Sequence, residues 1–587
     1  MSTGAPIVSR DTLATTLEQI ATLLELQGEN PFKTRAYRNG AETVRSYDGD
    51  IAAIAANNEL AGIPGIGKAL QDKLHELAST GKLGFYDNLR AQFPDTIFEL
   101  FEIQGLGPKK IKALYQELEV GSIARLKEVC ESGEVSQLGG FGKKTVANIL
   151  EAIAFREQNA SSFDRKTATH AAEMICDFLR TLPDAGQIEV AGSLRRGKET
   201  VGDLDFLVTT KNPQAVCDAF AAAPFVDRTI AHGSTKVSIN LDNGLQCDLR
   251  AISAEELPFA LSYFTGSKEH NVEVRSRMRK RGVSLNEYGL TPIDGANAPE
   301  IPQIHTEADL YKFLELDYIP PALRENRGEF DAAAEGTLPR LIELGDLRGT
   351  FHNHTVASDG NATLREMADA AIELGLEYLG IADHSKSSFQ ANGLDASRLQ
   401  WQIDEIRKLN DEFKQEGVNF RIFAGSEVDI LKDGSLDFPD DVLAQLDYVV
   451  ASVHNAFTLP EAQQTQRIIA AISNPHVTML GHLTGRLLLK REPYAVDVNA
   501  VIDAAAETKT IIELNANPRR LDMDWRHWHS ARDRGVLCSI NPDAHSTKGL
   551  QMLRFGVDVA RKGWLRKQDV LNTRTTKDVE RYLGLVC

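Results

Sequence analysis

Hydrophobic and polar positions follow different periods in different parts of the chain. Residues 67–83, "GKALQDKLHELASTGKL", place Leu70, Leu74 and Leu77 at helical spacing, which predicts an amphipathic helix. Residues 201–208, "VGDLDFLV", alternate acidic and apolar positions, as a half-buried strand does. Towards the carboxyl end, short apolar runs alternate with helical segments, which predicts repeated strand-helix units. With 587 residues the chain is too long for one core, so we expect several domains.

One glycine pattern occurs three times in the first third, in "LAGIPGIGKAL", "FEIQGLGPKKI" and "VSQLGGFGKKTV". Glycine permits a tight turn, and the helix that follows presents free N–H groups to an anion such as a DNA phosphate. A tight turn between helices needs glycine in any case, but three copies resemble the helix-hairpin-helix motif of non-specific DNA binding. The resemblance assigns DNA contacts to Gly65, Gly67, Gly105, Gly107, Lys109, Lys110, Gly140, Gly142, Lys143 and Lys144.

Composition limits the possible partners and compartment. The net charge of −18, with a pI near 5.3, weighs against nucleic acid, so DNA must be held by local basic patches such as "VRSRMRKRG" at 274–282. A solvated helix face is the alternative for that patch. The six cysteines have no regular spacing, which is typical of free thiols in a reducing compartment. No basic start precedes an apolar leader and no apolar run could span a membrane, so we expect a cytoplasmic protein without a membrane partner.

Two carboxylates in the predicted strand share one face, because Asp203 and Asp205 are two positions apart. Such a pair resists joint ionisation unless a cation lies between the acids. A strand edge that enters a turn is the alternative for a single Gly-Asp-x-Asp. A third acid, Asp248, alternates with apolar residues in "GLQCDLRAI". Three carboxylates on neighbouring strands can hold two divalent ions, which clamp the attacking and leaving oxygens of a phosphoryl transfer.

A turn just ahead of the acid pair suits a polyphosphate. In "VAGSLRRGKETVGD", Gly192 and Ser193 supply backbone N–H groups and a hydroxyl, and Arg195 and Arg196 supply guanidinium groups. This turn, the acids and the later "YFTGSKEHNVEVR" resemble the family X DNA polymerases, the DNA polymerase beta-like nucleotidyltransferases, over about residues 5–318.

The resemblance implies a role for each matching residue. Asp203 and Asp205 would bind both metals, magnesium or manganese, and Asp248 would bind the catalytic metal and help to activate the primer 3′-hydroxyl. Arg275 would contact the template strand in the minor groove. The implied nucleotide-binding residues are Gly192, Ser193, Arg196, Gly202, Tyr263, Phe264, Gly266 and Asn271. For the two aromatic residues, a plain place in the core is the alternative.

The amino-terminal region resembles the small domain that carries deoxyribose-phosphate lyase activity in some family members. Lys73 aligns with the lysine that forms the Schiff base there, and a surface lysine is the alternative reading. A lysine amine attacks an aldehyde well only when its surroundings lower its pKa. A neighbouring lysine of the pattern is replaced by Ala69, which weakens the case for lyase activity.

Potential metal ligands end one apolar run after another in the carboxyl-terminal region. Nine of the fourteen histidines lie beyond residue 350, and six of those nine fall at such ends. Ligands at the carboxyl ends of strands that alternate with helices are typical of a (β/α) barrel. One buried histidine is usually a core residue, whereas six at one edge predict a metal site. Asp383 and Asp429 are expected to support the ligands rather than to bind metal.

The spacing H-x-H, S-D-G, D-H, G-x-E-x-D, S-V-H, G-H and D-A-H resembles the PHP (polymerase and histidinol phosphatase) domain over about 345–587. The resemblance implies a trinuclear cluster of manganese or zinc that generates hydroxide for phosphoester cleavage. Exonuclease action, removal of a 3′ phosphate and cleavage at an abasic site all remain open. The implied ligands are His352, His354, Asp359, His384, Glu427, His454, His482, Asp543 and His545.

We therefore expect a multidomain chain of α+β and α/β class. Its expected parts are a lyase-like helical domain (1–85), a helix-hairpin-helix region (86–160), a nucleotidyltransferase palm (161–255), a thumb-like nucleotide-selection subdomain (256–318), a linker (319–344) and a PHP distorted (β/α) barrel (345–587).

The leading hypothesis is a monomeric DNA-directed DNA polymerase that fills short gaps in DNA repair, base excision repair included. Its substrates would be deoxynucleoside triphosphates and gapped or primer-template DNA, and its barrel would act as a 3′-5′ exonuclease or otherwise process 3′ ends. The main alternative is a gap-binding or end-binding scaffold whose barrel hydrolyses a small phosphoester. A third possibility is a template-independent nucleotidyl transferase.

Overall fold

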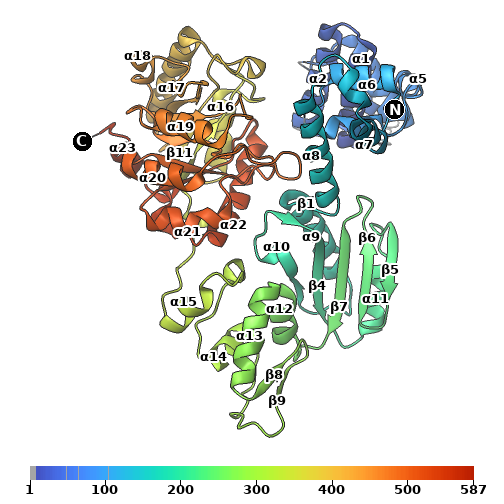
Figure 1. Ribbon diagram of the computed structural model, residues 1–587, viewed down its shortest axis with the longest axis vertical. Coiled ribbons are helices and arrows are strands. Elements are labelled where there is room, and N and C mark those ends of the chain that lie inside the picture. Colours follow the sequence, from blue (N-terminus) through green and yellow to red (C-terminus); the bar gives the residue numbers. More distant parts are fainter. Residues whose placement is uncertain (1–7, 48, 64, 104, 587) are drawn as a thin grey trace. The chain divides into compact units, whose positions relative to one another are not determined.

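The computed structural model describes residues 8–586 except 48, 64 and 104, and the side chain of Ser46. The chain divides after Ala160 into two compact units (Figure 1). Within the described residues no helix is long and apolar enough to cross a membrane.

The first unit consists of helices only. All three glycine turns have the same conformation: the first glycine has a left-handed φ of 83–88°, and the second lies just before a helix that no side chain caps. One continuous apolar core, from Leu13 to Ile153, joins these helices. The amphipathic helix expected at 67–83 is confirmed as α4. The elements are α1 Arg10–Gln27, α2 Pro31–Ser46, α3 Ile51–Ala56, α4 Lys68–Thr80, α5 Gly84–Arg90, η1 Ile97–Glu102, α6 Pro108–Leu118, α7 Ile123–Ser132, η2 Glu134–Gln137 and α8 Lys143–Asn159.

The second unit begins with a five-stranded mixed sheet of order β2-β4-β7-β6-β5. The alternation in "VGDLDFLV" is confirmed as β4, whose apolar residues are buried while Asp203 is exposed and Asp205 half-buried. Strands β4 and β7 run parallel, so the acid pair and Asp248 lie on neighbouring strands as expected. The elements are β1 Phe163–Asp164, α9 Arg165–Arg180, β2 Ile188–Val190, α10 Gly192–Arg195, β3 Thr200–Val201, β4 Asp203–Thr209, α11 Pro213–Ala221, β5 Arg228–His232, β6 Lys236–Asn240 and β7 Gln246–Ile252.

A small helical region with its own apolar core follows the sheet. Its central ion-pair network joins Glu307 to Arg195, at 2.7 Å, and to the fully buried Arg324. The network thereby fixes this region to the turn at α10. The elements are α12 Leu257–Thr265, α13 Lys268–Lys280, β8 Val283–Leu285, β9 Leu290–Pro292, α14 Glu307–Phe313, η3 Pro321–Leu323, α15 Glu329–Glu335 and η4 Leu344–Asp346.

The remainder forms a seven-stranded, all-parallel sheet in which each strand pairs with the next along the chain, from β10 to β16. A bridge between Asn353 and Ala544 brings the first strand to the last, so the sheet is a nearly closed barrel, and helices surround it (Figure 1). The expected distorted (β/α) barrel is confirmed. Its strands are β10 Gly349–Asn353, β11 Tyr378–Ile381, β12 Arg421–Asp429, β13 Tyr448–Ser452, β14 Met479–Leu480, β15 Ile511–Asn515 and β16 Cys538–Asn541. Its helices are α16 Leu364–Glu373, η5 Phe389–Ala391, α17 Ala396–Glu416, α18 Asp440–Leu443, α19 Glu461–Ile472, α20 Val498–Thr508, α21 Trp525–Asp533, η6 Thr547–Met552, α22 Leu553–Lys562, η7 Lys567–Asp569, η8 Leu571–Thr573 and α23 Thr576–Tyr582.

Candidate active sites

The three carboxylates of the mixed sheet share one face. Asp205 on β4 lies directly opposite Asp248 on β7 in the parallel register, and Asp203 is two residues before Asp205. Lys236 on β6, which the sequence did not single out, places its Nζ 2.8 Å from Asp248 Oδ2. Asp248 therefore has a cationic neighbour, whereas the pair on β4 has none this close among the described ion pairs.

The electrostatics of this site favour a bound cation. Burial, followed by the charges of Asp203 and Asp248, raises the pKa of Asp205 to about 7. Burial and Asp248 likewise raise the pKa of Asp203. Burial opposes ionisation of Asp248 too, but hydrogen bonds, with Lys236 foremost, lower its pKa overall. A divalent ion would relieve the repulsion that raises the first two pKa values, so the donor set fits the metals that the sequence implies.

The turn at α10 packs directly on the acids. Gly192 has a φ of 66°, and a Cβ at this position would lie 2.6 Å from Asp205 Oδ2. Both the left-handed backbone and the close approach therefore require glycine here. The Oγ of Ser193 is buried and has no hydrogen-bond partner. An unpaired buried hydroxyl is costly, and a phosphate oxygen would satisfy it.

Arg196, which the resemblance assigns to the triphosphate, is held by other parts of the chain. Its Nη1 donates to the carbonyl of Thr265 at 2.5 Å, and its Nε donates to Glu325 Oε1 at 3.0 Å. Glu325 also contacts Lys562 of α22, whose ammonium donates to the carbonyl of Arg196 at 3.1 Å. A barrel residue thus takes part in a network around the predicted triphosphate ligand, and sequence spacing gave no sign of it.

The predicted nucleotide-selection residues surround the junction of α12 and α13. Tyr263 and Phe264 are half-buried and stack edge to face at 5.0 Å, and Asn271 donates to the carbonyl of Tyr263 at 2.6 Å. Gly266 approaches Arg196, since a Cβ there would lie 3.1 Å from Nη1. Arg275 follows one turn later on α13 and donates to the carbonyl of Asn271. Gly202 is exposed between β3 and β4.

The nine predicted ligands of the barrel converge at the carboxyl ends of its strands. Potential ligand atoms lie within 4.8 Å of one another in three groups. His354 belongs to two of the groups and His384 also to two, so the groups adjoin. The ninth residue, His482, places Nε2 2.9 Å from Glu427 and 3.3 Å from His454 Nε2. The groups are His354, Asp359, His384 and His545; His352, His354 and Asp543; and His384, Glu427 and His454.

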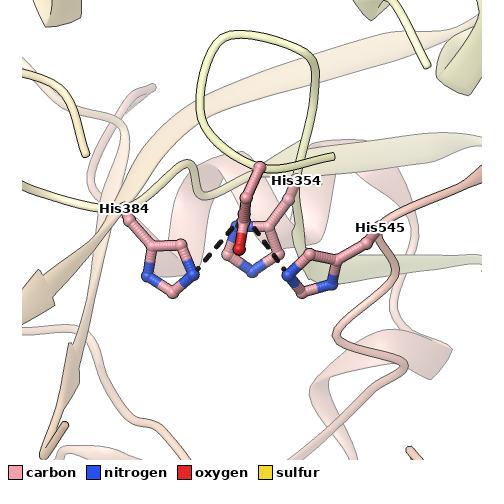
Figure 2. Close-up of side chains that lie close together, drawn as sticks. His354, His384 and His545 are labelled. Carbon is pink, nitrogen blue, oxygen red and sulfur yellow. Dashed lines mark ion pairs between the residues drawn. The ribbon is translucent and has the colours of Figure 1, made fainter. Parts of the chain in front are cut away.

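Figure 2 shows the imidazoles of His354, His384 and His545 turned towards a common point. Asp359 lies among them, with an oxygen 3.4 Å from His545 Nε2 and 3.7 Å from His384 Nε2. Burial first, and then the neighbouring histidines, lowers the pKa of His354 to about 4, so this ring is neutral near pH 7. Neutral imidazole is the form that binds metal.

The buried nitrogens of this cluster fit metal ions. Nε2 of His352 and both ring nitrogens of His354 are buried without hydrogen bonds. His352 and Asp543 also have left-handed backbones, with φ of 55° and 51°. Such strain is found mainly at functional sites, where the surrounding structure imposes it. A metal ion would satisfy the unpaired nitrogens, and imidazole with carboxylate suits zinc or manganese.

Supporting contacts orient the ligands. Asp429 accepts from His454 Nδ1 at 2.8 Å, and Asp383 accepts from the backbone and hydroxyl of Thr355 beside His354. The supporting roles expected of these two acids agree with these contacts. Glu513 on β15 was missed: its Oε1 accepts from His352 Nδ1 at 2.6 Å, and its Oε2 accepts from the backbone of His482. Its signal was the run "TIIELN", an apolar strand that ends in polar residues like the others.

In the first unit, the predicted DNA-binding residues occupy the three glycine turns and the first turns of α6 and α8. Lys109, Lys143 and Lys144 are exposed, while Lys110 donates to the carbonyl of Gly105. Lys73 is half-buried on α4, with Nζ 4.8 Å from the centre of the Phe85 ring. This contact neither assigns nor removes a lyase role, which stays a prediction.

Five family models match consecutive parts of the chain. They are described as helix-hairpin-helix domain (9–83), SAM-like helix-hairpin-helix tandem (97–154), DNA polymerase beta palm (163–243), DNA polymerase beta thumb (260–325) and PHP domain (350–517). The palm match includes Asp203 and Asp205, and the PHP match includes seven of the nine barrel ligands.

One curated relative matches almost the whole chain. The DNA polymerase/3′-5′ exonuclease PolX of Bacillus subtilis (strain 168) is 39% identical over 97% of this chain and 98% of its own length. The chain belongs to the PolX family. Membership in the PolX family confirms the resemblance to family X polymerases with a carboxyl-terminal PHP domain.

Two further relatives each match one part of the PolX architecture. A probable phosphatase of Thermoanaerobacter sp. (strain X514) is 30% identical over 40% of this chain and 92% of its own length. DNA polymerase lambda of Rattus norvegicus is 24% identical over 53% of this chain and 55% of its own length. Each of these two relatives thus covers only part of this chain.

Proposed function

We propose that the protein fills short gaps in DNA as a DNA-directed DNA polymerase and processes DNA 3′ ends with its barrel as a 3′-5′ exonuclease. The observation that carries the proposal is the co-occurrence of a complete carboxylate triad and a complete nine-residue ligand set in one chain of the PolX family. Two complete sets, each held by dedicated neighbours, favour two active sites over an idle scaffold.

In the polymerase reaction, Asp203 and Asp205 would hold two magnesium or manganese ions, with Asp248 binding the ion at the primer end. When bound, these ions supply the charge that stabilises phosphoryl transfer. Ser193 and Arg196 would hold the triphosphate, and the segment around Tyr263 would disfavour a ribose 2′-hydroxyl. Arg196 must exchange its contact with Glu325 for phosphate, or share it, when a nucleotide binds.

In the barrel, the nine ligand residues, which gather in three adjoining groups, would hold three manganese or zinc ions. Bound metals of this kind lower the pKa of water enough to supply hydroxide at neutral pH. The neutral ring of His354 and the contact from Glu513 to His352 keep ligand nitrogens available.

The three glycine turns would hold DNA backbone phosphates without reading sequence, because their helix N-termini present free N–H groups beside exposed lysines. This arrangement explains how a chain of net charge −18 can bind DNA. We further propose that the chain acts as a monomer in the cytoplasm. The described cysteines are all free and buried, which fits a reducing compartment.

The test uses purified protein, manganese and a 5′-labelled primer in a one-nucleotide gap, with and without deoxynucleoside triphosphates. Extension with nucleotides and stepwise shortening without them is the expected result. Extension alone would overturn the exonuclease assignment and favour phosphatase action on a small phosphoester, in line with the phosphatase relative. Extension that persists without a template strand would indicate template-independent transfer. Tight gap binding with neither reaction would overturn the enzyme proposal in favour of a scaffold.

A further inference from the structure

A loop on the rim of the barrel cluster displays an exposed aromatic ring. Residues 385–394, which we name the rim loop, follow the ligand His384. The backbone N–H of Ser385 donates to the backbone carbonyl of Glu427. Ser388 Oγ donates to Asp429 at 2.7 Å and lies 3.3 Å from His454 Nδ1. Phe389, the next residue, must therefore lie beside the cluster, and it is 87% exposed.

The exposure of Phe389 does not result from a loosely held loop. Ser387 is fixed to Asp437 through both its backbone and its hydroxyl, and Asn392 donates to the carbonyls of Ala357 and Ser358. A fixed loop that leaves a benzyl group in water forgoes roughly 2 kcal/mol of apolar burial. A surface feature of this kind usually serves recognition.

Apolar side chains and a free cation continue this surface. Val356, two residues beyond the ligand His354, is 54% exposed, and Trp401 on α17 is 59% exposed. These two line a hollow of about 500 Å³ together with Leu394, the last residue of the rim loop. Lys386 of the rim loop is exposed and forms no ion pair within the described part of the chain.

We propose that Phe389, with Val356 and Trp401, forms a stacking surface for unpaired nucleobases at the DNA 3′ end, and that Lys386 contacts the adjoining phosphates. The inference rests on the proposed exonuclease function of the barrel. Aromatic rings beside a cation are the usual means of holding single-stranded nucleic acid, because every base has a π-face and every linkage a negative charge. The cluster would then receive the last phosphodiester of a strand whose bases lie on the rim.

A base that stacks on Phe389 cannot at the same time be paired in a duplex. Phe389 would therefore hold a strand only where its 3′ end is already unpaired.

The experiment compares two single strands of equal length, one ordinary and one whose last three nucleotides lack bases. Shortening is measured with manganese for the full-length wild type, Phe389→Ala and Phe389→Trp. On the ordinary strand, Phe389→Ala should raise KM about tenfold with little change in kcat. Phe389→Trp should have a KM close to that of the wild type, because its ring can also stack on a base. On the strand without terminal bases, wild type and Phe389→Ala should have the same KM.

Tyr582→Ala is the matched control. Tyr582 is 39% exposed on α23 and contacts the carbonyl of Lys509, which precedes β15, so it lies at the end of the barrel opposite the cluster. Its replacement should change neither substrate's KM.

Two outcomes would overturn the inference alone: Phe389→Ala with wild-type KM on both strands, or an equal rise on both strands, which would indicate a structural effect on the cluster. A wild type that shortens neither strand would overturn the exonuclease proposal itself and the inference with it.

Discussion

Lys562 of the barrel helix α22 is fully buried against Glu325, the same carboxylate that accepts from Arg196 Nε at 3.0 Å. The barrel therefore supplies one of the cations that hold the carboxylate beside the predicted triphosphate ligand. Burial lowers the pKa of Lys562 to about 8, so the residue is charged at pH 7.

Lys562→Met should weaken nucleotide binding at the polymerase site. Without the ammonium, Glu325 pairs more tightly with Arg196 and keeps it from the triphosphate, which we expect to raise the nucleotide KM about two- to tenfold. Steady-state gap filling measures this change, and exonuclease rates should stay normal. Asp558→Asn is the control, because it removes another contact of the same helix, to Arg165, without touching Glu325. An equal effect of both variants would mean that the helix acts only by holding the interface.

Gly192→Ala should abolish most polymerase activity. A Cβ would clash with Asp205 Oδ2 at 2.6 Å, and the left-handed backbone adds about 1–2 kcal/mol of strain. We expect at least a tenfold fall in kcat/KM for gap filling. Gly289→Ala, at an open position with an ordinary backbone, should be harmless. Near-normal gap filling by Gly192→Ala would show that Asp205 does not need this close approach.

The acid pair was predictable from the sequence because strand periodicity alone places Asp203 and Asp205 on one face. The role of Asp248 was predictable only from the family resemblance. The barrel ligands were predictable because all of them except Asp359 lie in the last part of an apolar run or directly after it. The roles of Lys236, Glu325 and Lys562 were not predictable. Their contacts depend on which strands are neighbours and on how the domains pack, and these arrangements leave no local pattern in the sequence. Glu513 was missed for a different reason. Its strand end looks like the others, but glutamate is common at exposed positions, and Glu513 stands outside the motifs that resemble the PHP domain.

Glu307→Gln should make the second unit less stable and less sensitive to acid. Although burial opposes its ionisation, Arg324 and Arg195 lower the pKa of Glu307 from 4.5 to about 2. Its carboxylate therefore contributes about 3 kcal/mol to the free energy of unfolding. This contribution is fully present above pH 4.5 and is lost as the pH falls towards 2.

Urea unfolding followed by tryptophan fluorescence tests this prediction, because all four tryptophans lie in the second unit. The difference in the free energy of unfolding between wild type and Glu307→Gln should be largest at pH 7 and about 1 kcal/mol smaller at pH 3.5. A difference in the free energy of unfolding that does not change with pH would contradict the lowered pKa of Glu307.

The barrel should bind three metal ions per chain. Elemental analysis after dialysis against manganese or zinc should give about three ions for the wild type. Glu513→Gln should weaken binding about 10- to 100-fold, since Glu513 orients His352. Glu507→Gln, on the surface helix α20, is the control. Full metal retention by Glu513→Gln would show that this contact is dispensable.

The most direct test of two separate sites assays Asp205→Asn and His384→Ala on the same labelled, one-nucleotide-gapped primer. Asp205→Asn should lose extension and still shorten the primer, and His384→Ala should extend the primer without shortening it. Loss of both reactions in either variant, with folding intact by tryptophan fluorescence, would contradict the assignment of the two reactions to two independent sites.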